Sequence, residues 1–138
     1  GSNKLLTAVI SAANSYIAND TATAAKELMD IDVSSLPTDD AKKLYNTIAE
    51  AAMKPAANEF YTQGTTAYNK ADYTTAATAF VNAYKCDSTK AEAAYYAAKS
   101  YVALNQTEDA KKYYQYIVDG FRSSSYYSEA NAYVTSHS

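Results

Sequence analysis

The chain has 138 residues, of which 48% are hydrophobic, and a formal net charge of −3. This length suffices for one domain with a buried core. The slightly acidic balance argues against nucleic acid and against an anionic membrane surface as partners. No apolar run predicts a transmembrane helix and no signal peptide is visible, so we expect a membrane to be reached only through missing parts of the parent protein. Gly1 and Ser2 are typical of a cloning remnant, and we expect the natural chain to begin upstream.

Tyrosine and alanine dominate the composition. Tyr occurs 15 times and Trp not at all, while Gly occurs three times and Pro twice. Much alanine and few helix breakers favour closely packed helices. Arg122 is the only arginine, and Tyr, Asn, Thr and Ser stand where charged residues would often be found. We interpret this composition as an indication of an extracytoplasmic bacterial protein, with a cytoplasmic location left open.

The first predicted element is a helical hairpin with its linker, over residues 3–37. Apolar residues recur every three or four positions from residue 3 to residue 18, which predicts a helix. Asn19 and Asp20 break this pattern, and Asp20 or Thr21 can cap a second helix that runs to about residue 30. The pair is either a degenerate copy of the repeats described below or an unrelated pair of helices.

The second predicted element is a long helix. Residues 31–37 suit an extended linker, after which Thr38 or Asp39 can cap a helix that runs from Asp39 to about Lys70. Pro55 lies in its middle, where it removes one backbone donor. We expect either one long helix with a kink near residues 51–54 or a break at which Pro55 opens a new helix.

A fixed period of 34 residues organises the rest of the chain. Residues 64–83 fall on residues 98–117 when shifted by this amount, and five small or apolar positions keep their size class. The matching pairs are Gly64 and Ala98, Ala67 and Tyr101, Ala76 and Ala110, Phe80 and Tyr114, and Ala83 and Ile117. A period of this length is typical of repeated helix–turn–helix units that stack on one another.

The first unit, residues 57–90, begins with the second half of the long helix, whose first half is residues 38–56. A turn follows at residues 71–73, and Thr74 or Thr75 starts the second helix, with Phe80 facing inward. Residues 87–89 are expected to end that helix and to cap the next one.

The second unit, residues 91–122, pairs a helix at 91–104 with a helix at 108–119. Gly120 can adopt a left-handed conformation and close that second helix. Residues 123–138 are expected to form a capping helix and a tail, opened by one of the serines at 123–125. This helix would lay Ala130 and Tyr133 over the open end of the second unit.

The segments 64–76 and 98–110 resemble the tetratricopeptide repeat (TPR) family. The resemblance implies an all-α fold: a short right-handed α-solenoid of antiparallel helix pairs, with about seven helices, a long central helix and a C-terminal capping helix. The tyrosine-rich segment 110–130 is similar to the TPR variant of bacterial envelope proteins. The chain departs from the family pattern at the large residue beside the first small one, which is Gln63 in one unit and Ala97 in the other.

No catalytic constellation is visible. His137 is the only histidine and Cys86 the only cysteine, so no metal site of converging Cys and His ligands and no histidine-based nucleophile pair can be assembled. Carboxylates are adjacent only at residues 39–40 and 108–109, both at predicted helix starts, where the helix dipole explains them. We therefore predict no enzymatic activity, no cofactor and no metal, and interpret Cys86 as a small buried hydrophobe.

The family resemblance implies a concave face lined by the first helix of each unit. There the many tyrosines would provide large contact area and a hydroxyl for hydrogen bonding, although several of them, such as Tyr84, Tyr101 and Tyr114, are expected to pack between helices. The predicted lining residues are Asn58, Tyr61, Thr65, Tyr68, Asn69, Glu92, Tyr95, Lys99 and Val102.

Two hypotheses for function follow from this face. The first is a module that binds a protein or peptide partner within a larger bacterial envelope or surface protein. The second is a structural spacer or self-association domain, whose groove is filled by its own flanking helices or by a second copy. A cell-wall carbohydrate is a third ligand class, suggested only by the many tyrosines.

Overall fold

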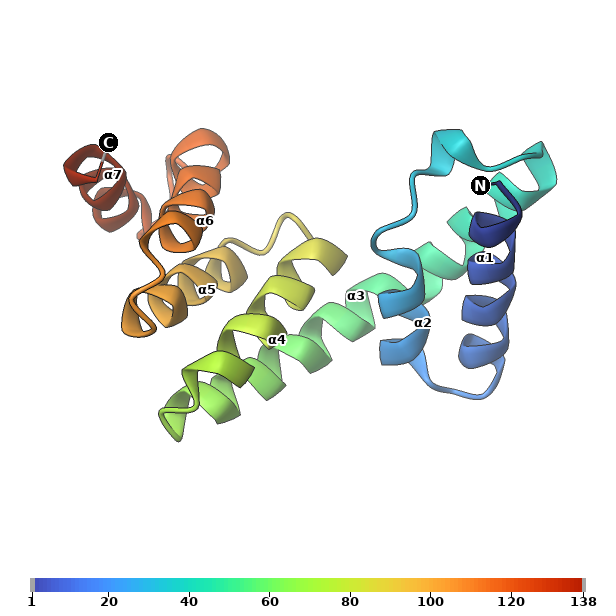
Figure 1. Cartoon of the computed structure of the whole chain (residues 1–138), viewed down its shortest axis with the longest axis horizontal. Coiled ribbons are helices and arrows are strands. Elements are labelled where there is room, and N and C mark those ends of the chain that lie inside the picture. Colours follow the sequence, from blue (N-terminus) through green and yellow to red (C-terminus); the bar gives the residue numbers. More distant parts are fainter. Residues whose placement is uncertain (1, 138) are drawn as a thin grey trace. The chain divides into compact units, whose positions relative to one another are not determined.

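The computed structural model describes residues 2–137, with side chains from residue 4 onward, and over that range the chain is all-helical. Seven α-helices pack one on the next along the chain, which is the arrangement of a helical solenoid, and the predicted fold class is confirmed. The chain divides into two compact units, residues 1–59 and residues 60–138. Each unit has its own hydrophobic core, and helices make up both units (Figure 1).

The first unit contains α1 (Ser2–Ile17), α2 (Thr21–Leu28), the short 3₁₀ helix η1 (Val33–Ser35) and the first part of α3 (Asp39–Asn69). α1 and α2 pack as a hairpin. The linker at 31–37 is not simply extended as expected, because the Asp32 carboxylate accepts from the Ser34 N–H and starts the 3₁₀ turn. The core of this unit is aliphatic and consists of Val9, Ala12, Ala24, Leu28, Leu36, Ala41, Ile48 and Ala52.

α3 is one helix from Asp39 to Asn69 with Pro55 inside it. The alternative of a break at Pro55 is therefore wrong. At the start of the helix the Thr38 hydroxyl oxygen accepts from the Ala41 N–H at 3.1 Å, as a capping side chain does. Asp39 and Asp40 lie in the first turn, where they complement the positive end of the helix dipole.

The second unit contains the end of α3, then α4 (Tyr73–Cys86), α5 (Ala91–Ala103), α6 (Thr107–Gly120) and α7 (Tyr127–Ser136). α5 packs on both α4 and α6, and α7 packs on α6. In Figure 1 these four helices run from yellow-green to dark red. Their shared core consists of Ala67, Ala76, Phe80, Ala94, Ala97, Ala98, Tyr113, Tyr114, Ile117 and Ala130, with half-buried tyrosines around it.

Small residues set the spacing of the helices in this unit. The buried face of α5 consists of alanines and Ser100. On α3, Gly64 faces Phe80 so closely that a Cβ atom there would lie 2.8 Å from the ring. Gly64 therefore leaves room for the buried Phe80 ring between α3 and α4, while most tyrosine rings pack half-buried around the alanines.

The same turn closes three successive helix pairs. Asn19, Ala71 and Asn105 have φ angles of 65°, 62° and 60°, the left-handed conformation that ends many helices. In each turn the following residue donates its N–H to the carbonyl five residues back, as in a Schellman motif. These bonds join Asp20 to Ser15, Asp72 to Ala67 and Gln106 to Tyr101, at 2.8, 2.9 and 2.9 Å.

Several predicted helix ends are wrong. Gly120 has no positive φ and is the last residue of α6. Phe121 caps this helix, because its N–H donates to the Ile117 carbonyl. α4 begins before Thr74, because the Asp72 carboxylate accepts from the Thr75 N–H. The N-caps of α5 and α7 are Lys90 and Tyr126, neither with a capping side-chain hydrogen bond, so the Ser and Thr residues expected to cap them do not.

Candidate functional site

Equivalent positions of three helices meet on one face of the second unit. Shifted by 34 residues, Tyr61 of α3 matches Tyr95 of α5, and Tyr95 matches Glu129 of α7, which it contacts. By the same shift Lys99 matches Tyr133, and Val102 matches Ser136. The α7 residues on this face therefore lie 34 positions after those of α5, although the residue types differ. Two cavities open on this tyrosine-rich face.

The first cavity has a volume of about 180 Å³. Its floor is Phe80 of α4, which is 1% exposed. Rings from two further helices stand around this floor: the Phe80 centroid lies 5.5 Å from that of Tyr61, 6.4 Å from that of Tyr68 and 5.6 Å from that of Tyr96. The complete lining is Tyr61, Thr65, Tyr68, Asn69, Phe80 and Tyr96.

Mutual contacts hold the rings of the first cavity in place. Tyr68 meets Tyr96 edge-on at 5.7 Å, and Tyr61 meets Tyr96 edge-on at 6.4 Å. Such edge-to-face pairs contribute about 0.5–1.5 kcal/mol beyond the area that they bury. Burial also raises the pKa of Tyr61 above its ordinary value, and its interaction with Tyr96 adds to this shift. The walls are therefore flat, neutral and preformed.

The polar groups of the first cavity are few and uncharged. The Thr65 hydroxyl donates to the Tyr61 carbonyl at 2.9 Å, which leaves its oxygen as an acceptor. The Asn69 carboxamide forms no side-chain hydrogen bond with any residue that the structure describes, and it is exposed at the edge of the cavity. It can therefore both donate to and accept from a ligand.

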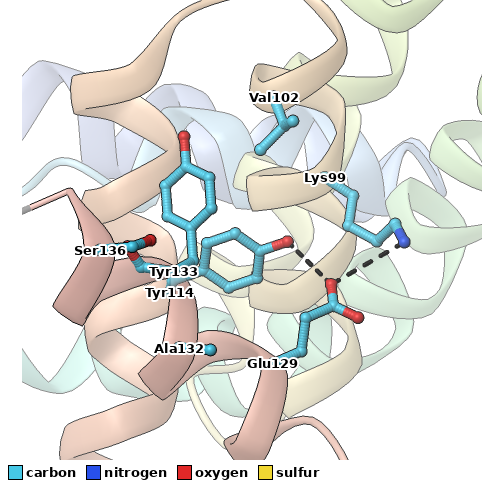
Figure 2. Close-up of a pocket in the computed structure, with 7 residues that line it drawn as sticks. All are labelled: Lys99, Val102, Tyr114, Glu129, Ala132, Tyr133 and Ser136. Carbon is cyan, nitrogen blue, oxygen red and sulfur yellow. Dashed lines mark hydrogen bonds and ion pairs between the residues drawn. The ribbon is translucent and has the colours of Figure 1, made fainter.

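The second cavity has a volume of about 390 Å³ and lies between α5, α6 and α7 (Figure 2). The rings of Tyr114 and Tyr133 form one wall, with centroids 4.8 Å apart. Lys99 and Glu129 provide opposite charges on the other side, as Figure 2 shows. The complete lining is Lys99, Val102, Tyr114, Glu129, Ala132, Tyr133 and Ser136.

Glu129 joins the helices around the second cavity. Its carboxylate accepts hydrogen bonds from the hydroxyls of Tyr95 at 2.9 Å and Tyr114 at 3.0 Å, and it lies 3.8 Å from the Lys99 ammonium. Burial, followed by the hydrogen bond to Glu129, raises the pKa of Tyr114 far above its ordinary value and that of Tyr95 to a smaller extent. Both hydroxyls therefore remain protonated donors at neutral pH.

Tyr95 links the two cavities through ring contacts. Its ring lies edge-on to Tyr96 of the first cavity at 5.0 Å and stacks on Tyr126 at 4.3 Å. It also lies 6.3 Å from the ring of Tyr114 in the second cavity. The tyrosine-rich face is thus one continuous set of rings.

Six of the nine predicted lining residues line these two cavities. Tyr61, Thr65, Tyr68 and Asn69 line the first, and Lys99 and Val102 line the second. Of the others, Tyr95 lies between the cavities, Glu92 forms an ion pair with Lys90 at 3.3 Å, and Asn58 belongs to the first unit.

Sequence reasoning missed Glu129, Tyr133 and Ser136. The signal that would have found them was present, because the 34-residue shift carries Tyr95, Lys99 and Val102 onto these three residues. The tyrosines expected to pack between helices do so: Tyr114 is 3% exposed, and Tyr84 and Tyr101 pack half-buried against the core.

The described part of the chain contains no group of three or more His, Cys, Asp or Glu side chains that could hold a metal ion. Cys86 is half-buried, and burial raises the pKa of its thiol to about 11, so it is not an activated nucleophile. Among the described residues, no helix combines the length and apolarity needed to cross a bilayer.

Comparison with known proteins gives no relative. No protein-family model matches the chain, and neither a curated protein nor a solved structure matches it significantly.

Proposed function

We propose that the chain is a non-enzymatic, TPR-like module that binds a protein or peptide partner on its tyrosine-rich face. The observation that carries this proposal is the pair of cavities lined by period-equivalent residues of α3, α5 and α7. A face built from equivalent positions of successive helices can follow an extended ligand, because the helices present their lining residues at a regular spacing.

The chemistry of the face suits recognition by contact area. Tyrosine buries a large apolar ring with few rotamers and keeps a hydroxyl for hydrogen bonding. The rings of Tyr61, Tyr68, Tyr95 and Tyr96 are half-buried and held by one another. A ligand would therefore meet surfaces that lose little conformational freedom on binding, which favours affinity.

Selection of peptides from a random displayed library tests the proposal. The wild-type protein should enrich related sequences that bind in solution, and a Tyr68→Ala/Tyr95→Ala variant, folded by circular dichroism, should bind them at least tenfold more weakly. A Tyr16→Ala/Tyr116→Ala variant is the matched control, because these tyrosines are exposed and line neither cavity. The proposal is contradicted if the wild type enriches no sequence. It is also contradicted if the Tyr68→Ala/Tyr95→Ala variant binds the selected peptides as tightly as the Tyr16→Ala/Tyr116→Ala control does.

A second candidate function is a spacer or self-association domain with an occupied face. It is favoured by one observation: α7 and the residue before it engage the face, because Glu129 accepts a hydrogen bond from Tyr95 and pairs with Lys99, while Tyr126 stacks on Tyr95. Sedimentation equilibrium tests the self-association form of this candidate. A dimer that dissociates when Tyr68 and Tyr95 are both replaced by Ala would support self-association, and a monomer at all concentrations would remove it.

A further inference from the structure

We infer that the first cavity receives a proline ring from an extended, uncharged segment of the partner. This inference rests on the proposed function, because it names the chemistry that the same face would recognise. Three properties of the cavity carry it: its size, its lack of charge and the free polar group at its edge.

The size of the cavity fits one small ring. An apolar cavity of about 150 Å³ in a protein can hold one benzene molecule, and the first cavity measures about 180 Å³. Its walls are the rings of Tyr61, Tyr68 and Tyr96, and its floor is Phe80. Flat aromatic walls of this kind are what proline-rich segments use when they dock on aromatic-lined grooves.

The charges around the cavity favour a neutral ligand over a charged one. Aromatic cages bind ammonium groups, but here the Lys90 ammonium of the chain itself already lies 5.1 Å from the centre of the Tyr61 ring. No carboxylate lines the cavity. Lys90 already lies over the Tyr61 ring and is paired with Glu92 at 3.3 Å, so a second cation would have to compete with Lys90, whereas an anion would find no cationic lining residue. A neutral ring meets neither obstacle.

The hydrogen-bonding group at the edge fits a backbone that offers acceptors. A polyproline II segment has no internal hydrogen bonds, so its carbonyl oxygens are available, and proline contributes no N–H. The Asn69 carboxamide has two donor hydrogens and forms no side-chain bond with the described residues. It can therefore donate to a ligand carbonyl beside the bound ring. Because such a segment is already extended, it loses little entropy on binding.

Fluorescence anisotropy with a labelled nonaproline peptide tests this inference, with a Gly-Ser peptide of equal length as the ligand control. The wild-type protein should bind nonaproline and not the Gly-Ser peptide. Tyr68→Ala should weaken binding by about tenfold or more, as removal of an aromatic contact at a binding hot spot does. Asn69→Ala should weaken it by about threefold to tenfold, the loss expected for one hydrogen bond.

A pair of neighbouring threonines provides a matched control that does not disturb the core. Thr65 and Thr66 are both exposed on α3, and each hydroxyl donates to the carbonyl four residues back. Only Thr65 lines the first cavity. Thr65→Lys should abolish nonaproline binding by placing bulk and charge at the cavity, whereas Thr66→Lys should bind as the wild type does.

The outcomes also separate this inference from the function on which it rests. If nonaproline does not bind, or if Thr65→Lys and Thr66→Lys bind it equally, the inference is overturned. If in that case library-selected peptides without proline still require Tyr68, the peptide-binding function survives. If the library yields no peptide either, both fail together.

Discussion

The two units close their helix pairs with the same turn but fill their cores differently. Asn19 in the first unit and Asn105 in the second have nearly the same left-handed φ, and each is followed by the same backbone bond. The first core is aliphatic, with Val9, Leu28 and Ile48 fully or almost fully buried. The second core combines alanines with aromatic rings, and many of those rings reach the surface.

This difference explains why the cavities described here lie in the second unit. Valine, leucine and isoleucine can be buried completely, whereas a tyrosine packed at the margin of an alanine contact keeps its hydroxyl and one ring edge exposed. A core of small residues and tyrosines therefore produces a surface of ordered rings as a consequence of its packing. The four predictions that follow test this comparison.

The largest effect is expected from Phe80→Ala, which removes the floor of the first cavity and the most buried ring of the second core. Phenylalanine-to-alanine changes in cores lower the free energy of unfolding by about 3–5 kcal/mol. Urea denaturation followed by circular dichroism measures this loss. Leu28→Ala in the aliphatic core is the counterpart, with an expected loss of about 2–5 kcal/mol. A loss below about 1 kcal/mol for Phe80→Ala would show that the ring does not organise this core.

Gly64→Ala tests how closely α3 approaches α4. The added Cβ would lie 2.8 Å from the buried Phe80 ring, and overpacking of this kind costs about 1–3 kcal/mol, partly offset by the higher helix propensity of alanine. A net loss of about 1–2 kcal/mol is expected in the same denaturation measurement. Gly120→Ala is the control, because nothing lies within 4 Å of its added Cβ and its φ is not positive. Equal stabilities of the two variants would refute the close approach.

Tyr114→Phe tests the buried hydroxyl of the second core. At pH 7 the variant loses the hydrogen bond to the half-exposed Glu129, which should cost about 1 kcal/mol. The folded-state pKa of Tyr114 is raised above its ordinary 10.0, so below pH 10 the group is protonated in both states and ionisation has no effect. Above pH 10 it ionises only in the unfolded state, and the wild type loses stability that Tyr114→Phe does not lose.

The stability of the wild type relative to Tyr114→Phe should therefore fall above pH 10, by up to about 1.4 kcal/mol for each pH unit, so that the difference disappears or reverses by pH 11. Urea denaturation of both proteins at pH 8 and pH 11 measures this difference. If the difference in stability between the two proteins is the same at both pH values, folding does not raise the pKa of the Tyr114 hydroxyl.

The smallest effects concern the shared turn. Asp20 caps α2 by accepting from the Thr23 N–H, whereas Gln106 occupies the same place before α6 with no capping side-chain bond. Asp20→Ala should lower the unfolding temperature, because it removes this cap, and Gln106→Asp should raise stability by about 0.5–1 kcal/mol, because it adds one. Thermal unfolding measures both changes. If Gln106→Asp does not stabilise the protein, the two turns are not equivalent.

Local patterns in the sequence predicted much of the fold. The apolar stripe from Asp39 onward predicted a helix that ends at Asn69 in the structure. Thr38 and Asp20, each one of two predicted capping candidates, form the capping bonds. The period of 34 residues predicted which helices repeat. These features depend on neighbours in the chain, which a sequence displays directly.

Features that depend on tertiary packing were less predictable. Residue type left a break at Pro55 open and favoured a left-handed Gly120, whereas the continuity of α3 and the helical conformation of Gly120 depend on how the surrounding helix is supported. The place of Glu129 in the site depends on α7 continuing the repeat, although that helix was expected only to cover an open end. Which tyrosines form a cavity follows from ring contacts between helices, and no local pattern encodes these.

The most direct test of the tyrosine-rich face is a solution NMR titration that follows the ring signals of all tyrosines while a library-selected peptide is added. The proposed function predicts large shifts for Tyr61, Tyr68, Tyr95 and Tyr96 of the second unit, with Tyr16 and Tyr45 of the first unit unchanged. Shifts concentrated on Tyr16 and Tyr45, or none at the first cavity under saturating peptide, would contradict it.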